Sequence, residues 1–136
     1  MEEDVKRLIA FDISSALRLV YIEQIHKHII ENYTEHVDFV LFDMEIKPYV
    51  PNQQIISQGR GGIDFENLKS YSDNYDKVMI VSDWIGLHLS EKVDKFNSNV
   101  YQADAHCLCE DINIGQVLKS SSGCSGKLVY INKFME

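Results

Sequence analysis

The stretch RLIAFD, residues 7–12, is a short apolar run that ends in an aspartate, and its form recurs twice further along the chain. VDFVLFD spans residues 37–43, and YDKVMIVSD spans residues 75–83. Short apolar runs without clean polar alternation are typical of strands that are buried on both faces of a mainly parallel sheet. The three runs therefore predict three core strands, each with an aspartate at its carboxyl end.

Helical patterns separate these runs. In residues 15–33, SALRLVYIEQIHKHIIENY, four aliphatic side chains recur at helical spacing without an intervening Gly or Pro: Leu19, Ile22, Ile25 and Ile29. This pattern predicts a helix of about 18 residues. Residues 44–57 contain both prolines of the chain, which predicts an extended edge strand or a hairpin. DFENLKSYS, residues 64–72, predicts a short helix capped by Asp64.

The second half of the chain continues the alternation. Residues 89–97 and 111–121 have helical patterns, and residues 99–109 contain a fourth core strand. Residues 127–134 close the chain as a strand, or as a strand that runs into a short helix. Because strands and helices alternate, we expect an α/β fold: a doubly wound, mainly parallel sheet with helices on both faces, in a Rossmann-like three-layer sandwich. A length of 136 residues is enough for one core, so residues 1–136 are expected to form a single domain.

Composition argues against several functional classes. A formal net charge of −8 disfavours broad contact with nucleic-acid phosphates and favours a partner protein with a basic surface. No apolar run is long enough for a membrane span, and the acidic start MEEDVKR is unlike a signal peptide, so we expect a cytoplasmic protein. An odd number of cysteines, three, fits a reducing compartment. Frequent Lys, Ile and Asn are typical of an AT-rich coding genome, such as that of a phage or a low-GC bacterium.

The strand-ending aspartates are the main candidates for a site. In doubly wound folds, ligands bind beyond the carboxyl ends of the strands, where the strand order reverses, so Asp12, Asp43 and Asp83 are candidates for one face. Ser14 follows Asp12 by two residues, and together they offer hard oxygen donors that suit Mg²⁺. The alternative is that Ser14 or Ser15 only caps the helix that follows.

A glycine-rich segment, GRGGIDF at residues 59–65, adds a specific motif. The succession of LIAFDISSA, a helix, VDFVLFD, GRGGIDF and KVMIVSD resembles von Willebrand factor A-like domains, most closely the metallopeptidase-associated branch with a GRGGTDF loop. The likeness runs from the first strand to residue 86, and the final third matches only in its alternation of elements. The resemblance implies a metal-ion-dependent adhesion site. Asp12 and Ser14 match its first two ligand positions, and Asp83 matches its last.

Two positions depart from the family pattern. Ala16 stands in place of the second serine of the D-x-S-x-S loop, and Ile63 stands in place of the threonine of the middle loop. Both changes replace a hydroxyl with an apolar group. Mg²⁺ is often held by one or two carboxylates with water in its other positions, so a weak or vestigial Mg²⁺ site is expected. A contact with the partner protein that needs no metal is the alternative.

The glycines of the GRGGIDF segment would let this middle loop pass close over the Asp12 loop, or would serve only a tight turn.

The resemblance implies a protein–protein interaction module, acting as an adaptor or an inhibitor through the loops at the carboxyl ends of the strands. Arg60, Asp64 and Trp84 are expected to surround the metal site and to contact the partner, with Trp84 as an aromatic anchor. The second hypothesis is a Mg²⁺-dependent hydrolase or phosphoryl-transfer enzyme that uses the three strand-ending aspartates. No GxSxG, Cys–His or HExxH signature supports catalysis, so an enzyme is the weaker hypothesis.

Two further groups of side chains have metal-binding residue types. His106, Cys107, Cys109 and Cys124 do not have the C-x₂₋₄-C spacing of structural zinc sites, and a C-x-C pair in a strand sends both sulfurs to one face. Zinc is therefore not expected. His26 and His28 are two residues apart in the predicted helix and do not face each other, so we expect them to be solvated or partly buried.

Overall fold

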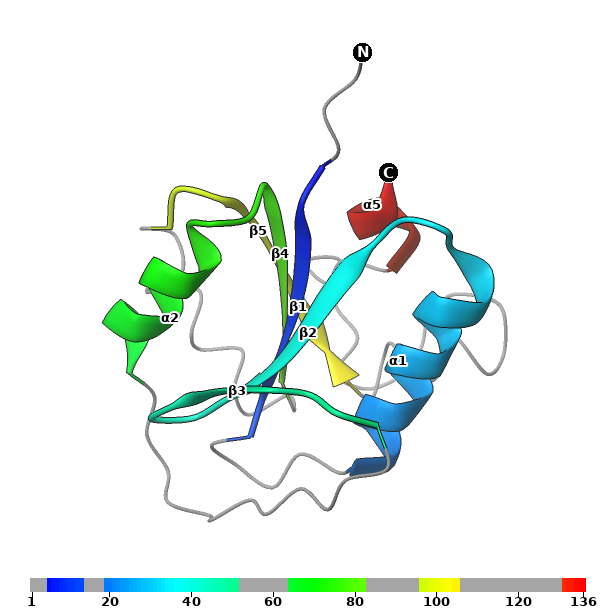
Figure 1. The fold of residues 1–136 in the computed structure, drawn as a ribbon, viewed down its shortest axis with the longest axis horizontal. Helices are drawn as coiled ribbons and strands as arrows, with labels where there is room; N and C mark the ends of the chain where they lie inside the picture. The colour runs from blue at the N-terminus through cyan, green and yellow to red at the C-terminus, as the bar shows by residue number, and fades with distance from the viewer. Residues whose placement is uncertain (1–4, 14–18, 52–63, 83–95, 106–130) are drawn as a thin grey trace, which may run out of the picture.

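Buried parallel strands form the centre of the molecule (Figure 1). The computed structural model describes residues 5–13, 19–51, 64–82, 96–105 and 131–136. The three apolar runs that predicted core strands are confirmed as β1 (Arg7–Asp12), β2 (Val37–Phe42) and β4 (Lys77–Ser82). The fourth predicted strand is confirmed as β5 (Asn99–Asp104).

The described strands form one sheet in the order β3-β2-β1-β4-β5. β1 lies between β2 and β4 and pairs with both in parallel, with Arg7 opposite Val37 on one side and Lys77 on the other. β5 is parallel to β4, whereas the short β3 (Ile46–Pro48) is antiparallel to β2. The described chain therefore has an α/β fold with a five-stranded mixed sheet.

The hairpin between β2 and β3 confirms the extended edge predicted from the two prolines. Its turn is closed by the N–H of Asp43, which donates to the Glu45 carbonyl oxygen at 3.0 Å. The Asp43 carboxylate in turn accepts from the N–H of Glu45 at 2.9 Å. Pro48 is the last residue of β3 and has no N–H to donate, which suits an edge strand. The N–H of the next residue, Tyr49, still donates to the carbonyl oxygen of Phe39 in β2 at 3.1 Å.

One face of the sheet is covered by α1 (Leu19–Asn32) and α5 (Ile131–Met135). Side chains alternate between the faces of a strand, so Ile9 and Phe11 of β1 lie on the same side and pack in one apolar cluster with both helices. The described part of the predicted helix 15–33 is α1. Its aliphatic stripe is confirmed at Ile22, Ile25 and Ile29, all buried in that cluster.

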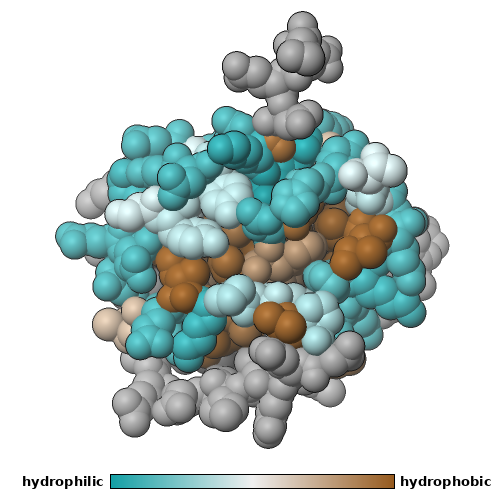
Figure 2. Space-filling model, viewed as in Figure 1, coloured by the Kyte–Doolittle hydropathy of each residue, from teal (hydrophilic) through white to brown (hydrophobic). Residues whose placement is uncertain are grey.

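The opposite face carries α2 (Phe65–Ser72), and Figure 1 shows it across the sheet from α1 and α5. Leu68 of α2 packs with Leu8 and Ala10 of β1 in a second apolar cluster. The predicted cap is confirmed, because the Asp64 carboxylate accepts from the N–H of Asn67 at 3.0 Å. Hydrophobic side chains also reach the surface between α1 and α2, where hydrophilic ones surround them (Figure 2).

A buried arginine anchors α5 to the start of β1. The guanidinium of Arg7 donates from Nε to the carbonyl oxygen of Phe134 at 3.3 Å. Its Nη2 donates to the main-chain oxygens of Met135 at 3.2 Å and Glu136 at 3.0 Å. Lys77 adds a hydrogen bond from Nζ to the same Glu136 oxygen. Because the last carbonyls of a helix have no partner within the helix, these cations satisfy them and complement the helix dipole.

Several predicted elements lie outside the described residues. Most of the predicted helix at 89–97 and all of the one at 111–121 are in this group, as is the strand predicted from residue 127. The short helix predicted after that strand corresponds to α5. In the described ranges, none of the helices combines the length and apolar character needed to cross a membrane.

Candidate functional site

Asp12 lies at the carboxyl end of β1, at the centre of the sheet. It pairs in register with Phe42 of β2, and the preceding Phe11 pairs with Val81 of β4. β2 and β3 extend from one side of β1, whereas β4 and β5 extend from the other, so the strand order reverses at this strand. Only 1% of the Asp12 surface is exposed. A buried carboxylate thus occupies the place where α/β sheets most often bind ligands.

Two more aspartates lie at this end of the sheet. Asp43 directly follows β2, and its carbonyl oxygen accepts from the N–H of Asp64 at 3.4 Å. This contact brings the start of α2 to the end of β2. We call the group formed by Asp12, Asp43 and Asp64 the acidic rim. Its members come from separate segments, and the sequence predicted that Asp12 and Asp43 would lie on one face.

Each outer carboxylate of the acidic rim also supports the local backbone. Asp43 accepts from the N–H of Glu45 in the hairpin turn, and Asp64 accepts from the N–H of Asn67 in the first turn of α2. These hydrogen bonds hold the side chains of Asp43 and Asp64 in place without requiring a ligand. The carboxylates of Asp43 and Asp64, beside the buried Asp12 at this end of the sheet, favour a cation or a basic surface.

The other predicted site residues lie outside the described residues. This applies to Ser14 and Asp83 of the predicted metal site and to Arg60 and Trp84 of the predicted partner surface. It also applies to the predicted zinc-type residues His106, Cys107, Cys109 and Cys124. Within the described ranges, no group of three or more His, Cys, Asp and Glu side chains could hold a metal ion.

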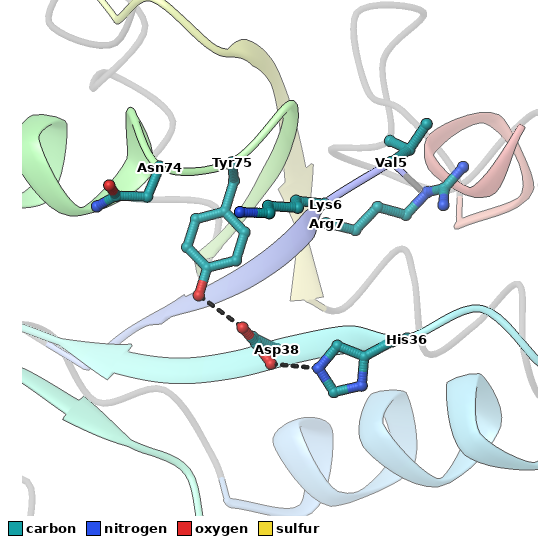
Figure 3. Close-up of a pocket in the computed structure, with 7 residues that line it drawn as sticks. All are labelled: Val5, Lys6, Arg7, His36, Asp38, Asn74 and Tyr75. Carbon is teal, nitrogen blue, oxygen red and sulfur yellow. Dashed lines mark hydrogen bonds and ion pairs between the residues drawn. The ribbon is translucent and has the colours of Figure 1, made fainter. Parts of the chain in front are cut away.

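A second candidate site is a cavity of about 350 Å³ at the amino ends of the central strands (Figure 3). Its walls come from residues 5–7 at the start of β1, from His36 and Asp38 at the start of β2, and from Asn74 and Tyr75 after α2. It lies at the opposite end of β1 and β2 from the acidic rim. We call it the amino-end pocket.

Asp38 is the centre of a hydrogen-bond chain in the amino-end pocket. The Tyr75 hydroxyl donates to Oδ2 of Asp38 at 2.6 Å, and Nε2 of His36 lies 2.6 Å from Oδ1. Figure 3 shows both rings converging on the carboxylate. The hydrogen bond from Tyr75 lowers the pKa of Asp38, against an opposing effect of burial, and His36 lowers it further. An ionised carboxylate only accepts, so Nε2 of His36 carries the hydrogen.

Tyr75, which donates the hydrogen bond to Asp38, stays protonated. Burial raises the pKa of its hydroxyl far above the ordinary range, and the hydrogen bond to Asp38 raises it further. Its ring stacks on Tyr71 with centroids 5.9 Å apart. The neutral hydroxyl is therefore a fixed donor that holds Asp38 ionised and oriented.

Replacing Tyr75 by phenylalanine is expected to raise the pKa of Asp38, because the largest stabilising contact of the carboxylate is lost. A depressed carboxyl pKa stabilises the folded state above the unfolded pKa, and that stability is lost as the pH falls through the folded pKa. The variant should therefore lose less stability on acidification than the wild type. Carboxyl-carbon NMR titration measures the pKa. Tyr101→Phe is the matched control, since Tyr101 accepts from Asn99 and does not contact Asp38. An unchanged Asp38 titration in the Tyr75 variant would contradict the assignment.

The two helix histidines are both half-buried, as predicted. The ring of His26 makes edge contacts with Phe39 and Tyr49, at centroid distances of 4.7 and 5.0 Å. Burial lowers the pKa of His26. His28 is hydrogen-bonded through Nδ1 to the side-chain amide of Asn32 at 3.2 Å. The neighbours of His26 are aromatic rings of β2 and of the segment after β3, and the neighbour of His28 is an amide of α1.

Sequence reasoning missed the amino-end pocket, although a signal for it exists. Lys6 and His36 each directly precede a predicted core strand, and Tyr75 and Asp76 are the first two residues of the third predicted run. The amino ends of parallel strands meet at one edge, as their carboxyl ends do, so these polar residues could have been expected to converge.

Comparison of the chain with family models, with curated proteins and with solved structures finds no match.

Proposed function

We propose that the chain is a protein–protein interaction module that binds its partner through the loops at the carboxyl ends of the strands. The observation that carries this proposal is the buried Asp12 at the strand-order reversal, with Asp43 and Asp64 at the same end of the sheet. An acidic rim in a chain of net charge −8 favours a partner with a basic surface. The module would act in the cytoplasm as an adaptor or an inhibitor.

The proposed fold is a doubly wound, three-layer sandwich of the von Willebrand factor A-like type. The strand order with its reversal at β1 and the packing of helices on both faces of the sheet support this proposal. The GRGGIDF motif at residues 59–65 is its most specific sequence support. On this proposal, Asp12, Ser14 and Asp83 form a weak or vestigial Mg²⁺ site, and Arg60, Asp64 and Trp84 contact the partner.

The proposed metal site would increase the affinity for the partner protein, but it would not be the main source of that affinity. Mg²⁺ prefers hard oxygen ligands, and the site would offer two carboxylates and one hydroxyl. Ala16 and Ile63 remove two hydroxyls of the family pattern, so we infer that side-chain contacts such as that of Trp84 contribute more to binding than the ion.

Replacing Trp84 by alanine is expected to weaken partner binding by about thirtyfold or more, because buried aromatic anchors contribute about 2 kcal/mol or more to an interface. The partner is first isolated by affinity capture from the native host, and binding is then measured with the purified pair. The matched control is Lys27→Ala on the exposed side of α1, which should bind like the wild type. Each measurement is repeated with Mg²⁺ and with EDTA, and EDTA should weaken binding only a few-fold.

The outcomes separate the mechanisms. Loss of binding in EDTA and in Asp12→Asn would identify a working metal site and would overturn the proposal that it is vestigial. Equal binding by wild type and Trp84→Ala would contradict the proposed interface. Asp64→Asn tests the charge of the acidic rim while it retains a side chain that can cap α2.

A Mg²⁺-dependent hydrolase or phosphoryl-transfer enzyme is the second candidate function. Asp12 and Asp43 end neighbouring strands, and paired carboxylates of this kind can hold Mg²⁺ for phosphoryl chemistry. The proposal of a binding module predicts no turnover of p-nitrophenyl phosphate with Mg²⁺ or Mn²⁺. Turnover that is abolished in Asp12→Asn would favour the enzyme.

A further inference from the structure

We propose that the amino-end pocket binds a small zwitterion that carries both an amine and a carboxylate, such as a free amino acid. The ammonium group of the ligand would bind Asp38, and its carboxylate would bind Lys6. The pocket lies at the opposite end of the strands from the acidic rim, so this proposal does not depend on the proposed function. Its volume of about 350 Å³ is near the lower limit of small-molecule pockets and suits a ligand of this size.

The strand register places Lys6 and Asp38 on one side of the sheet. Asp38 pairs with Leu8 of β1, and side chains paired in register on neighbouring strands point to the same side. Lys6 precedes Leu8 by two positions, so the alternation along the strand gives it the same direction. Leu8 packs with Leu68 of α2, and Tyr75, which follows α2, forms the wall on this side. Two opposite charges from separate strands therefore line one cavity.

Asp38 is an ionised acceptor that has positions left for a ligand. It is in contact with the Tyr75 hydroxyl and with Nε2 of His36, and the neutral Tyr75 leaves the negative charge in place. A carboxylate can accept about four hydrogen bonds, and these two contacts use one position on each oxygen. The Asp38 side chain is 44% exposed, so a ligand can reach the remaining positions.

Lys6 supplies the opposite charge and is fixed through its backbone. Its N–H donates to Oδ2 of Asp76 at 2.9 Å, and its carbonyl oxygen accepts from the N–H groups of Asp76 and Lys77 at 2.9 and 3.1 Å. Within the described ranges, no hydrogen bond engages its Nζ, and no ion pair joins it to Asp38. Figure 3 shows its side chain extending toward Tyr75, whose hydroxyl end contacts Asp38. A ligand with both charges can bridge these two groups, which do not pair with each other.

The same two charges disfavour a ligand of a single sign. A simple anion would face the ionised Asp38, and a simple amine would face the Lys6 ammonium group in the same cavity. Arg7 does not change this balance, because its guanidinium donates to the carbonyls of α5. Val5 and the ring of Tyr75 add apolar surface to the walls. The chemistry therefore favours an amino acid with an apolar side chain.

An NMR titration of the isotope-labelled chain with L-phenylalanine tests the proposal, and three probes with the same ring separate the two charges. Phenethylamine keeps only the positive charge, 3-phenylpropionate keeps only the negative charge, and 2-phenylethanol has neither. L-phenylalanine is expected to bind at least about tenfold more tightly than each probe, because only the zwitterion makes charge-assisted hydrogen bonds at both ends. Amide shifts are expected at Lys6, Asp38 and Tyr75.

Two variants assign the charges of the pocket to the two ends of the ligand. Asp38→Asn keeps an acceptor for Tyr75 and should weaken the binding of L-phenylalanine and phenethylamine about tenfold, but not that of 3-phenylpropionate. Lys6→Met keeps the aliphatic stem and should weaken the binding of L-phenylalanine and 3-phenylpropionate about tenfold, but not that of phenethylamine. Lys27→Met and Glu31→Gln, at exposed positions of α1, are the matched controls and should bind like the wild type. Circular dichroism checks that each variant is folded.

The crossed losses in the two variants would support the proposal. Equal affinity for L-phenylalanine and 2-phenylethanol would overturn it, as would shifts confined to residues outside the pocket. Unchanged affinity for L-phenylalanine in either Asp38→Asn or Lys6→Met would also overturn it, because the ligand is proposed to contact both side chains.

Discussion

Replacing Arg7 by methionine is expected to lower the free energy of unfolding by about 3 kcal/mol, which corresponds to a melting temperature about 10 °C lower. Arg7 is buried, with 7% of its surface exposed. It donates to the main-chain oxygens of Phe134, Met135 and Glu136. Methionine fills similar space but leaves the buried oxygens of Phe134 and Met135 without this donor, and an unsatisfied buried acceptor is costly. The Glu136 oxygen keeps its hydrogen bond from Lys77. Urea denaturation followed by circular dichroism gives the change.

Two variants define the mechanism of the Arg7 effect. Arg7→Lys keeps the charge but lacks the planar guanidinium, so it should recover only part of the stability. Lys27→Met removes an exposed cation of α1 and should change the stability by less than about 0.5 kcal/mol. A loss below about 1 kcal/mol in Arg7→Met would show that α5 is anchored mainly by its apolar side chains.

Replacing Ile25 by alanine is expected to cost about 3 to 4 kcal/mol, because it leaves a cavity in the cluster between α1 and the sheet. Ile25 is 0% exposed, whereas Ile30 in the same helix is 59% exposed. Ile30→Ala is thus a matched control with the same change in side chain and in helix propensity. It should alter the stability by less than about 0.5 kcal/mol.

The comparison of the two alanine variants isolates burial from helix propensity. Alanine is the better helix former, so propensity alone would stabilise both variants slightly. A loss confined to Ile25→Ala would confirm that the stripe facing the sheet supplies the stability of α1. Similar losses in both variants would instead mean that Ile30 is covered by another part of the chain.

The strands were the most predictable part of the fold, because a strand buried on both faces must be apolar at successive positions. That requirement marked β1, β2 and β4 in the sequence, and the prolines marked the edge strand β3. The helix cap at Asp64 was also predictable from the sequence, because its hydrogen bond joins residues three positions apart. The anchoring of α5 was not, because Arg7 and its acceptor Phe134 are separated by 127 positions. No local pattern reports such a contact.

The candidate site was predictable to the extent that it follows from strand direction. Asp12 and Asp43 end adjacent parallel strands, so their convergence followed from the pattern of the runs. The contact between Asp43 and Asp64 depends on the path of the chain between β3 and α2, which composition does not determine. The amino-end pocket forms where residues of separate segments meet, and its central contact joins Asp38 and Tyr75 across 37 positions, which no local pattern indicates.

The central position of β1 has a consequence for how the chain folds. This strand comes first in the sequence, yet both its partners and the helix that receives Arg7 come later, the last of them 127 positions away. Such a fold has a high contact order, and closing long loops before their contacts form slows the search for the native state. Until β4 and α5 arrive, Ile9 and Phe11 have no complete cover. The nascent chain should therefore be prone to aggregation and should benefit from a chaperone that shields its first strand.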